Sequence, residues 1–349
     1  MGILTKPAIV RPQYRITQDE MVDVLQRLHP NHPDWSKINR MIRNTQVNER
    51  YIVRPIEEII AHSRFEERSL IYKEEMRRLS VQAVEQALEN AELEAFQIDL
   101  IIVTSCTGFM MPSLTAYLIS DLPFREQTKQ LPIAQLGCAA GASAINRAAE
   151  YCEAFPGANV LIVSAELCSL CFQPAESAIS DFVSAALFGD SVSACVMKST
   201  SGTGFQVESN ASYLIKHTEN YIAYDVKDTG FHFVLDKQVM YTIETVAPVM
   251  REFVEETVQR APSDLDFFVF HTGGRRILDE LVKHLGIAEQ RVALSRESLA
   301  ECGNLSSVVV FDVLARLFEA GTRSPGDKGL LAAFGPGFTA EMCAGTWVE

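Results

Sequence analysis

One cysteine of the sequence has the setting of a nucleophile. Cys138 lies in the segment QLGCAAGASA (135–144), where a predicted strand (131–136) turns directly into a predicted helix of small residues. The unpaired backbone N–H groups at the start of such a helix favour a thiolate over a thiol, and small neighbours let an acyl group approach closely. A free cysteine is more often an inert buried side chain, so this interpretation depends on partners elsewhere in the chain.

Two polar residues in the second half of the sequence could act with Cys138. His271 follows an apolar run (265–270) and opens a Gly-Gly turn, while Asn304 lies in GNLSS (303–307), a turn into a second helix of small residues. The thiolate can accept an acyl group from a thioester with His271 as general base, and neutral donors on His271 and Asn304 can stabilise an enolate. The three residues therefore predict decarboxylative acyl transfer. A Cys-His-Asn peptidase is an alternative, although its cysteine would lie near a mature N-terminus.

The elements that must position these residues occur twice. A helix, a short polar link and an all-apolar strand occupy 87–103 and again 258–270. Cys138 follows Asp99 by 39 residues, and Asn304 follows Asp266 by 38. Strands that alternate with helices predict mixed sheets covered by helices. We therefore predict an α/β protein of two duplicated halves, 1–200 carrying the cysteine and 201–349 carrying the histidine and asparagine, with the site where the halves meet.

Composition excludes several other classes of protein. The 349 residues are 47% hydrophobic and 22% charged, which is typical of a globular protein, and the net charge of −14 argues against a nucleic-acid partner. No uncharged apolar stretch is long enough to span a membrane, and the first residues lack the apolar core of a signal peptide. Eight irregularly spaced cysteines indicate reduced thiols. The CSLC segment (168–171) has no second ligand pair, so we predict no metal site and a cytoplasmic location.

Five motifs in order resemble the type III polyketide synthases of the chalcone synthase superfamily. They are QLGCAAG (135–141), LFGD (187–190), HTGG (271–274), GNLSS (303–307) and FGPG (334–337). The resemblance implies a thiolase-like fold of five layers (αβαβα), a homodimer, and coenzyme A thioesters as substrates without a cofactor. It also identifies Cys138, His271 and Asn304 as the catalytic residues.

Three further segments resemble the bacterial tetrahydroxynaphthalene synthases: CTGFMMPSL (106–114), CSLC (168–171) and DTGFHF (228–233). This implies malonyl-CoA as both starter and extender, and a pentaketide that cyclises to tetrahydroxynaphthalene, the precursor of flaviolin. The alternatives are a type III synthase that makes pyrones or alkylresorcinols from an acyl-CoA starter, a priming ketoacyl-ACP synthase, and a non-catalytic chain-length subunit.

The family's remaining site residues map onto nine positions of this sequence. Phe188 and Phe231 would be gatekeepers between the coenzyme A tunnel and the cavity, and the cavity would be lined by Cys106, Cys171 and Ser306. Tyr224 would select the starter, and Met111 would cross the dimer interface. Lys37 and Arg40 would bind coenzyme A.

Some residues depart from the family pattern. Arg275 and Arg276 follow the Gly-Gly turn where the family has small residues, Asn44 replaces a third coenzyme A lysine, and Ala333 replaces a glycine. The resemblance implies no role for Cys302, which we expect to be a small buried residue.

Overall fold

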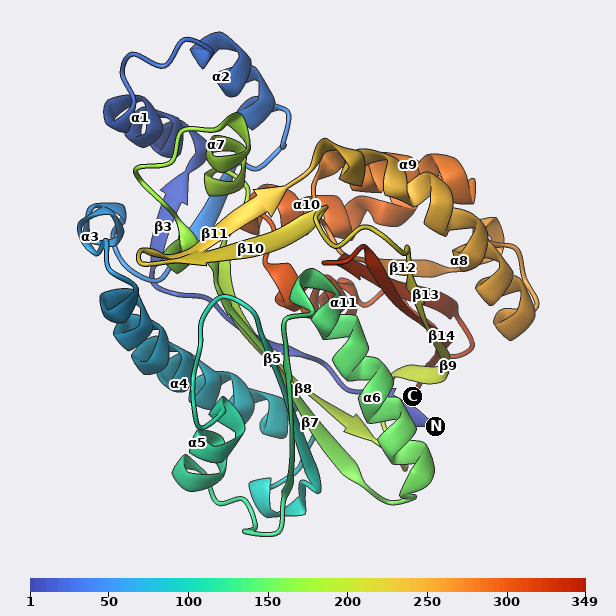
Figure 1. Cartoon of the computed structure of the whole chain (residues 1–349). Coiled ribbons are helices and arrows are strands. Elements are labelled where there is room, and N and C mark those ends of the chain that lie inside the picture. Colours follow the sequence, from blue (N-terminus) through green and yellow to red (C-terminus); the bar gives the residue numbers. More distant parts are fainter.

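Ten strands form one continuous hydrogen-bonded sheet in the computed structural model, which describes residues 1–349 (Figure 1). The strand order is β12-β13-β14-β9-β1-β8-β7-β5-β6, and β2 pairs with β8. The strands are β1 Gly2–Leu4, β2 Ala8–Val10, β5 Leu100–Ser105, β6 Lys129–Ala134, β7 Asn159–Leu167, β8 Asp190–Lys198, β9 Gly204–Leu214, β12 Phe267–Phe270, β13 Lys328–Gly335 and β14 Thr339–Val348.

The sheet consists of two wings with the mixed pairing that the sequence predicts. In the first wing β6, β5 and β7 are parallel and β8 is antiparallel. In the second wing β12 and β13 are parallel, while β14 and β9 continue antiparallel. The short strand β1 pairs with both β8 and β9 and so joins the wings.

Helices cover both wings and fill the space between them (Figure 1). The central helices α6 (Ala140–Ala154) and α11 (Val309–Ala320) pack with apolar residues of both wings in one core cluster. Helices α4 (Phe65–Asn90) and α5 (Leu114–Asp121) cover the outer face of the first wing. Helices α8 (Thr242–Val258) and α9 (Arg275–Leu285) cover that of the second. This arrangement confirms the predicted five-layer, thiolase-like fold.

Small residues allow the central elements to approach closely. A Cβ atom added at Gly141 of α6 would lie 2.1 Å from the carbonyl oxygen of Ser307, in the turn that precedes α11. Alanines fill much of the remaining buried face of α6. The small-residue helix that the sequence shows after Cys138 is therefore required by the contact between the two halves.

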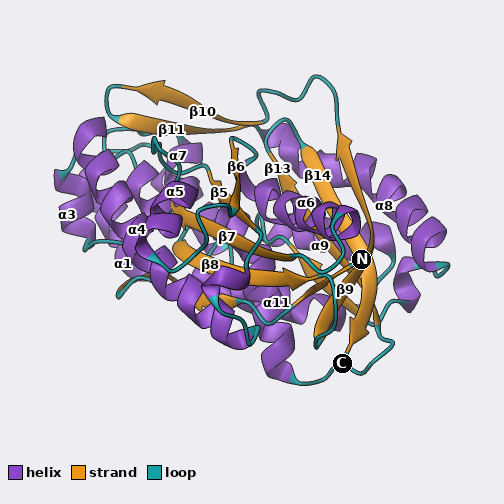
Figure 2. Ribbon diagram, turned by 90° about the horizontal axis from the view of Figure 1, so that it is seen from below, coloured by secondary structure: helices purple, strands orange, loops and turns teal.

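The remaining elements lie around the first wing and beside the second. The hairpin of β3 and β4 carries a satellite core with the helices next to it, and a separate hairpin of β10 and β11 pairs with no other strand (Figure 2). No helix of the protein combines the length and apolar character needed to cross a bilayer. The elements outside the sheet and its covering helices are α1 Gln18–Leu28, α2 Trp35–Arg43, α3 Ile56–Ala61, α7 Ile179–Ala185, α10 Ala293–Cys302, β3 Tyr14–Thr17, β4 Glu49–Ile52, β10 Ile222–Lys227 and β11 Gly230–Leu235.

Two local expectations differ from the structure. The strand predicted at 131–136 is β6 and ends at Ala134, and most of its residues are exposed because it forms the edge of the sheet. The strand does not turn directly into the helix, because a turn of 3₁₀ helix, Gly137–Ala139, precedes α6 and contains Cys138. The division of the chain at residue 200 stays a prediction.

Candidate active site

A cavity of about 840 Å³ lies at the carboxyl ends of β5 and β6, beside the hairpin of β10 and β11. Side chains from the whole length of the chain reach its wall, including Tyr72 of α4 and Pro336 of the loop after β13. The structure brings seven of the predicted site residues to this wall: Cys106, Met111, Cys138, Phe188, Tyr224, Phe231 and Ser306.

Glycine sets the position of Cys138. Gly137 has a φ of +50°, and a Cβ atom there would lie 2.6 Å from Cδ of Pro336, so the turn tolerates no side chain. Cys138 Sγ lies 3.6 Å from Oγ of Ser306. Burial raises the pKa of the Cys138 thiol to about 12, although hydrogen bonds from Ser306 and Asn304 act in the opposite direction. This desolvation opposes the effect of the helix start, so the preference for a thiolate at Cys138 stays a prediction.

Asn304 connects the other two predicted catalytic residues. Its Oδ1 accepts from the backbone N–H of Ser306 at 2.8 Å and from Nε2 of His271 at 3.3 Å. Because Oδ1 only accepts, His271 carries its proton on Nε2, and the Asn304 amide N–H group is left to face the thiol of Cys138. Burial lowers the pKa of His271 to about 4, so the imidazole is neutral. Both donors that the sequence predicts for an enolate are present and uncharged.

Backbone contacts hold Asn304 in place. Its N–H donates to the carbonyl of Leu187 at 2.8 Å, and its carbonyl accepts from Gly189 N–H at 3.1 Å. A Cβ atom at Gly303 would lie 2.4 Å from the Leu187 oxygen, and one at Gly189 would lie 2.3 Å from the Cys302 oxygen. The LFGD and GNLSS motifs thus form a single unit, which explains why both contain glycine. Cys302 is buried, as expected.

Glu166 of β7 is a site residue that the sequence analysis missed. Its fully buried carboxylate accepts from Ser307 Oγ at 2.5 Å, Thr107 Oγ1 at 2.9 Å and the backbone N–H of Cys106 at 3.1 Å. Ser306 Oγ, which contacts Cys138, also donates to it at 3.3 Å. Burial raises the pKa of Glu166. A single acidic residue within a buried, mostly apolar strand was the available signal.

Five predicted site residues are absent from the wall of the main cavity, namely the buried His271 and Asn304 and three others. Cys171 lines a smaller pocket of about 70 Å³ that shares Phe188 and Tyr224 with it. Lys37 and Arg40 are exposed on α2, on the side opposite the buried Ile38 and Ile42. The structure does not bring these two cations to the cavity wall.

The two departures after the Gly-Gly turn also face solvent. Arg275 pairs with Asp279 one helical turn along α9, and Arg276 lies over the ring of Tyr241. Nowhere do three histidine, cysteine or acidic side chains converge as metal ligands would.

Comparison with known proteins finds similarity to one family over nearly the whole chain. Residues 7–201 match the model of the N-terminal domain of chalcone and stilbene synthases, and residues 206–344 match the model of the C-terminal domain. The chain is 55% identical to a phloroglucinol synthase of Pseudomonas fluorescens over 99% of both chains. It is 48% identical to a 1,3,6,8-tetrahydroxynaphthalene synthase of Streptomyces griseus, over 100% of this chain and 94% of the relative.

Solved structures agree with this match. The crystal structure of 1,3,6,8-tetrahydroxynaphthalene synthase from Streptomyces coelicolor superposes with a TM-score of 0.97 at 48% identity, covering 99% of both chains. Germicidin synthase from the same organism, at 24% identity, shares the fold with a TM-score of 0.93 over 99% of both chains.

Proposed function

Since the chain belongs to the chalcone and stilbene synthase family of type III polyketide synthases, we propose that it builds an aromatic polyketide from malonyl-CoA alone on Cys138. The observation that carries this proposal is that Asn304 contacts both His271 and Cys138, and that Cys138 lines the cavity. The reaction needs no cofactor, because the thioester and the loss of CO₂ drive it.

Loading is the first proposed step. Cys138 Sγ attacks the thioester carbonyl of malonyl-CoA and forms a new C–S bond, and the C–S bond to coenzyme A breaks. Because Nε2 of His271 already carries its proton, the proton of the Cys138 thiol passes to the departing thiolate, and coenzyme A leaves as the free thiol. The open wall beside Gly137 assists the approach of the carbonyl, and Ser306 Oγ, which accepts a hydrogen bond from the Cys138 thiol, lies beside the attacking sulfur.

Extension follows from the two neutral donors. A second malonyl-CoA loses CO₂, and the electrons of the broken C–C bond form an enolate whose oxygen accepts hydrogen bonds from His271 and Asn304. The enolate carbon attacks the Cys138 thioester, so a C–C bond forms and the bond to Cys138 breaks. Transfer of the longer chain back to Cys138 prepares the next cycle.

Two products are consistent with a malonyl-CoA starter. Tetrahydroxynaphthalene, with ten ring carbons, requires five malonyl units, and it is the product we propose first, on the motifs shared with the relatives that are 48% identical. Phloroglucinol, with six carbons, requires three units and is favoured by the relative that is 55% identical. The cavity of about 840 Å³ has room for either chain.

The deciding experiment supplies the purified protein with malonyl-CoA alone and identifies the products by mass spectrometry. Detection of tetrahydroxynaphthalene with its oxidation product flaviolin would support the first candidate. Detection of phloroglucinol would support the second. No turnover until an acyl-CoA starter is added would contradict the malonyl-only proposal and favour a pyrone or alkylresorcinol synthase. Products made only from acyl carrier protein substrates would indicate a priming synthase.

The proposed nucleophile has its own test. The Cys138→Ala variant should lose chain extension by a factor of at least about 10³, because the thiol that carries the acyl chain is removed. Product formation from malonyl-CoA is the measurement, and circular dichroism checks that the variant is folded. Full-length polyketide from this variant would overturn the assignment.

We also propose a homodimer in which Met111 borders the cavity of the partner. Met111 is 81% exposed and Phe109 is 62% exposed, yet both line the cavity of this chain. Exposed apolar side chains next to a binding cavity indicate a covered surface. Light scattering of the purified protein should give twice the mass of the chain, and a monomer at micromolar concentration would contradict the proposal.

A further inference from the structure

One wall of the cavity is formed by an element that lies outside the main sheet. Strands β10 and β11 pair only with each other, and Figure 2 shows this hairpin apart from the ten-stranded sheet. Tyr224 of β10 and Phe231 and Phe233 of β11 point to the cavity. No backbone ladder from the sheet therefore fixes the position of this wall, and other contacts must do so.

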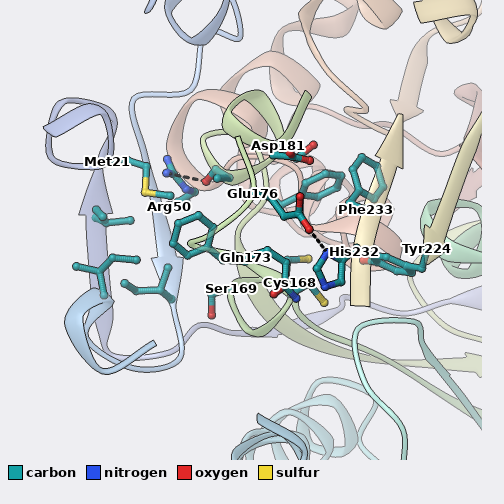
Figure 3. A pocket seen from close by; sticks show the side chains of 18 residues that line it. Met21, Arg50, Cys168, Ser169, Gln173, Glu176, Asp181, Tyr224, His232 and Phe233 are labelled. Atoms are coloured by element: carbon teal, nitrogen blue, oxygen red, sulfur yellow. Dashed lines mark hydrogen bonds and ion pairs between the residues drawn. The ribbon is translucent and has the colours of Figure 1, made fainter. Parts of the chain in front are cut away.

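The segment that follows Cys171 supplies most of the polar contacts to the hairpin. Gln173 Nε2 donates to the carbonyl oxygen of Phe231 at 2.9 Å. One oxygen of Glu176, Oε1, lies 2.9 Å from Nδ1 of His232 and 3.2 Å from Nζ of Lys227. Figure 3 shows Glu176 and His232 facing each other beside Tyr224 and Phe233. Glu176 thus contacts both strands of the hairpin at once.

His232 is the buried member of this group. Side chains alternate along a strand, so His232 points away from the cavity that Phe231 and Phe233 face, and it is only 8% exposed. Its Nε2 lies 2.7 Å from Oγ1 of Thr229, within the turn of its own hairpin. Its Nδ1 is the atom that reaches out of the hairpin, to Glu176. Lys227, by contrast, is half exposed, and exposed ion pairs contribute little.

We propose that the contact between Nδ1 of His232 and Glu176 sets the position of the hairpin wall, and thereby how the growing chain folds and when it is released. His232 is a positioning residue, because it acts through Phe231 and Phe233 and touches no substrate. The inference rests on the proposed function, since it assigns control over the product of the same cavity. Loading and decarboxylation depend on Cys138, His271 and Asn304, which the contact does not touch.

Two substitutions of His232 separate its two contacts. An asparagine amide occupies about the place of Nδ1, so His232→Asn keeps the contact to Glu176. A glutamine amide occupies about the place of Nε2, so His232→Gln keeps only the contact to Thr229. With malonyl-CoA as substrate, His232→Gln should raise the fraction of shortened, prematurely released products by about fivefold, the upper end of the effect of losing one ion pair. His232→Asn should stay near the wild-type ratio, and the rate of malonyl-CoA decarboxylation should change less than the product ratio in both.

Two further variants serve as independent checks. Glu176→Ala removes the same contact from the exposed side and should reproduce the His232→Gln product ratio, which keeps the test valid if a His232 variant does not fold. Lys227→Met removes the exposed pair and should leave the ratio unchanged. Equal product ratios in all variants, or equal shifts in His232→Asn and His232→Gln, would overturn the inference. Absence of any turnover in the wild type would instead contradict the proposed function.

Discussion

The catalytic residues and the β10–β11 wall of the same cavity are held in different ways. Asn304 is fixed by backbone hydrogen bonds to Leu187 and Gly189, at distances that exclude any Cβ atom on Gly303. The wall is fixed by side chains, among them Gln173 and Glu176. The reacting groups thus lie in a part of the molecule where few substitutions are tolerated, whereas the shape of the cavity depends on contacts that single substitutions can change.

The largest effect is expected where the backbone of the first region is disturbed. Gly303 and Gly286 both have a positive φ, +71° and +68°, but ψ is −164° at Gly303 and 33° at Gly286, and only Gly303 has an atom close to the position of a Cβ. Gly286→Ala should cost about 1 kcal/mol of unfolding free energy, from the left-handed backbone alone. Gly303→Ala should cost more than about 3 kcal/mol, because its backbone lies in a region that only glycine adopts readily and the Leu187 carbonyl must also move. Urea denaturation measures both, and equal losses would show that the close contact is unimportant.

The next effect concerns the buried carboxylate beside the thiols. In Glu166→Gln an amide N–H₂ group replaces one oxygen, so that donors face donors at Ser307 or at the Cys106 N–H. We expect a loss of about 2 kcal/mol of unfolding free energy, the cost of buried unsatisfied groups. Glu150→Gln, which removes an exposed pair with Arg147, is the matched control and should change stability by less than about 0.5 kcal/mol. A similar loss in both variants would show that the buried hydrogen bonds of Glu166 do not stabilise the site.

The pH dependence of stability tests the neutral state of His271. Burial lowers the pKa of His271 from 6.5 to about 4. Below pH 6.5 the unfolded chain therefore binds a proton that the folded chain does not, so this contribution to stability is complete above pH 6.5 and is lost as the pH falls toward 4. At pH 5 the loss is about 2 kcal/mol. Denaturation at pH 7.5 and pH 5 should show a smaller difference in His271→Asn, and an unchanged difference would contradict a buried neutral imidazole.

The smallest effect is expected for the two exposed cations of α2. If Lys37 and Arg40 bind the phosphates of coenzyme A, replacing either by Met should raise KM for malonyl-CoA about threefold with little change in kcat, as expected for an exposed charge pair of less than ~1 kcal/mol. Added salt should reduce the difference between variant and wild type. An effect on kcat alone would place these residues outside the binding step.

The features predicted correctly from the sequence are those encoded by adjacent residues. The strand-to-turn-to-helix pattern and the motifs around Cys138, His271 and Asn304 sufficed for the fold and for the three residues that the structure connects. Glu166 and the contact of His232 with Glu176 were missed because their meaning comes from partners far away in the sequence. The burial that raises the pKa of Cys138 was missed for a related reason, since this desolvation depends on the packing of the whole cavity.

The strand that joins the wings has a consequence for how the protein acquires its structure. β1 ends at Leu4, and its partners on β8 and β9 are Met197, Lys198 and residues 205–207. The seam of the sheet cannot close until about 200 further residues have left the ribosome, and contacts of such long range slow folding. The N-terminal strand β1 must therefore wait with its backbone groups unpaired until β8 and β9 have been made, and unpaired strands of this kind favour aggregation.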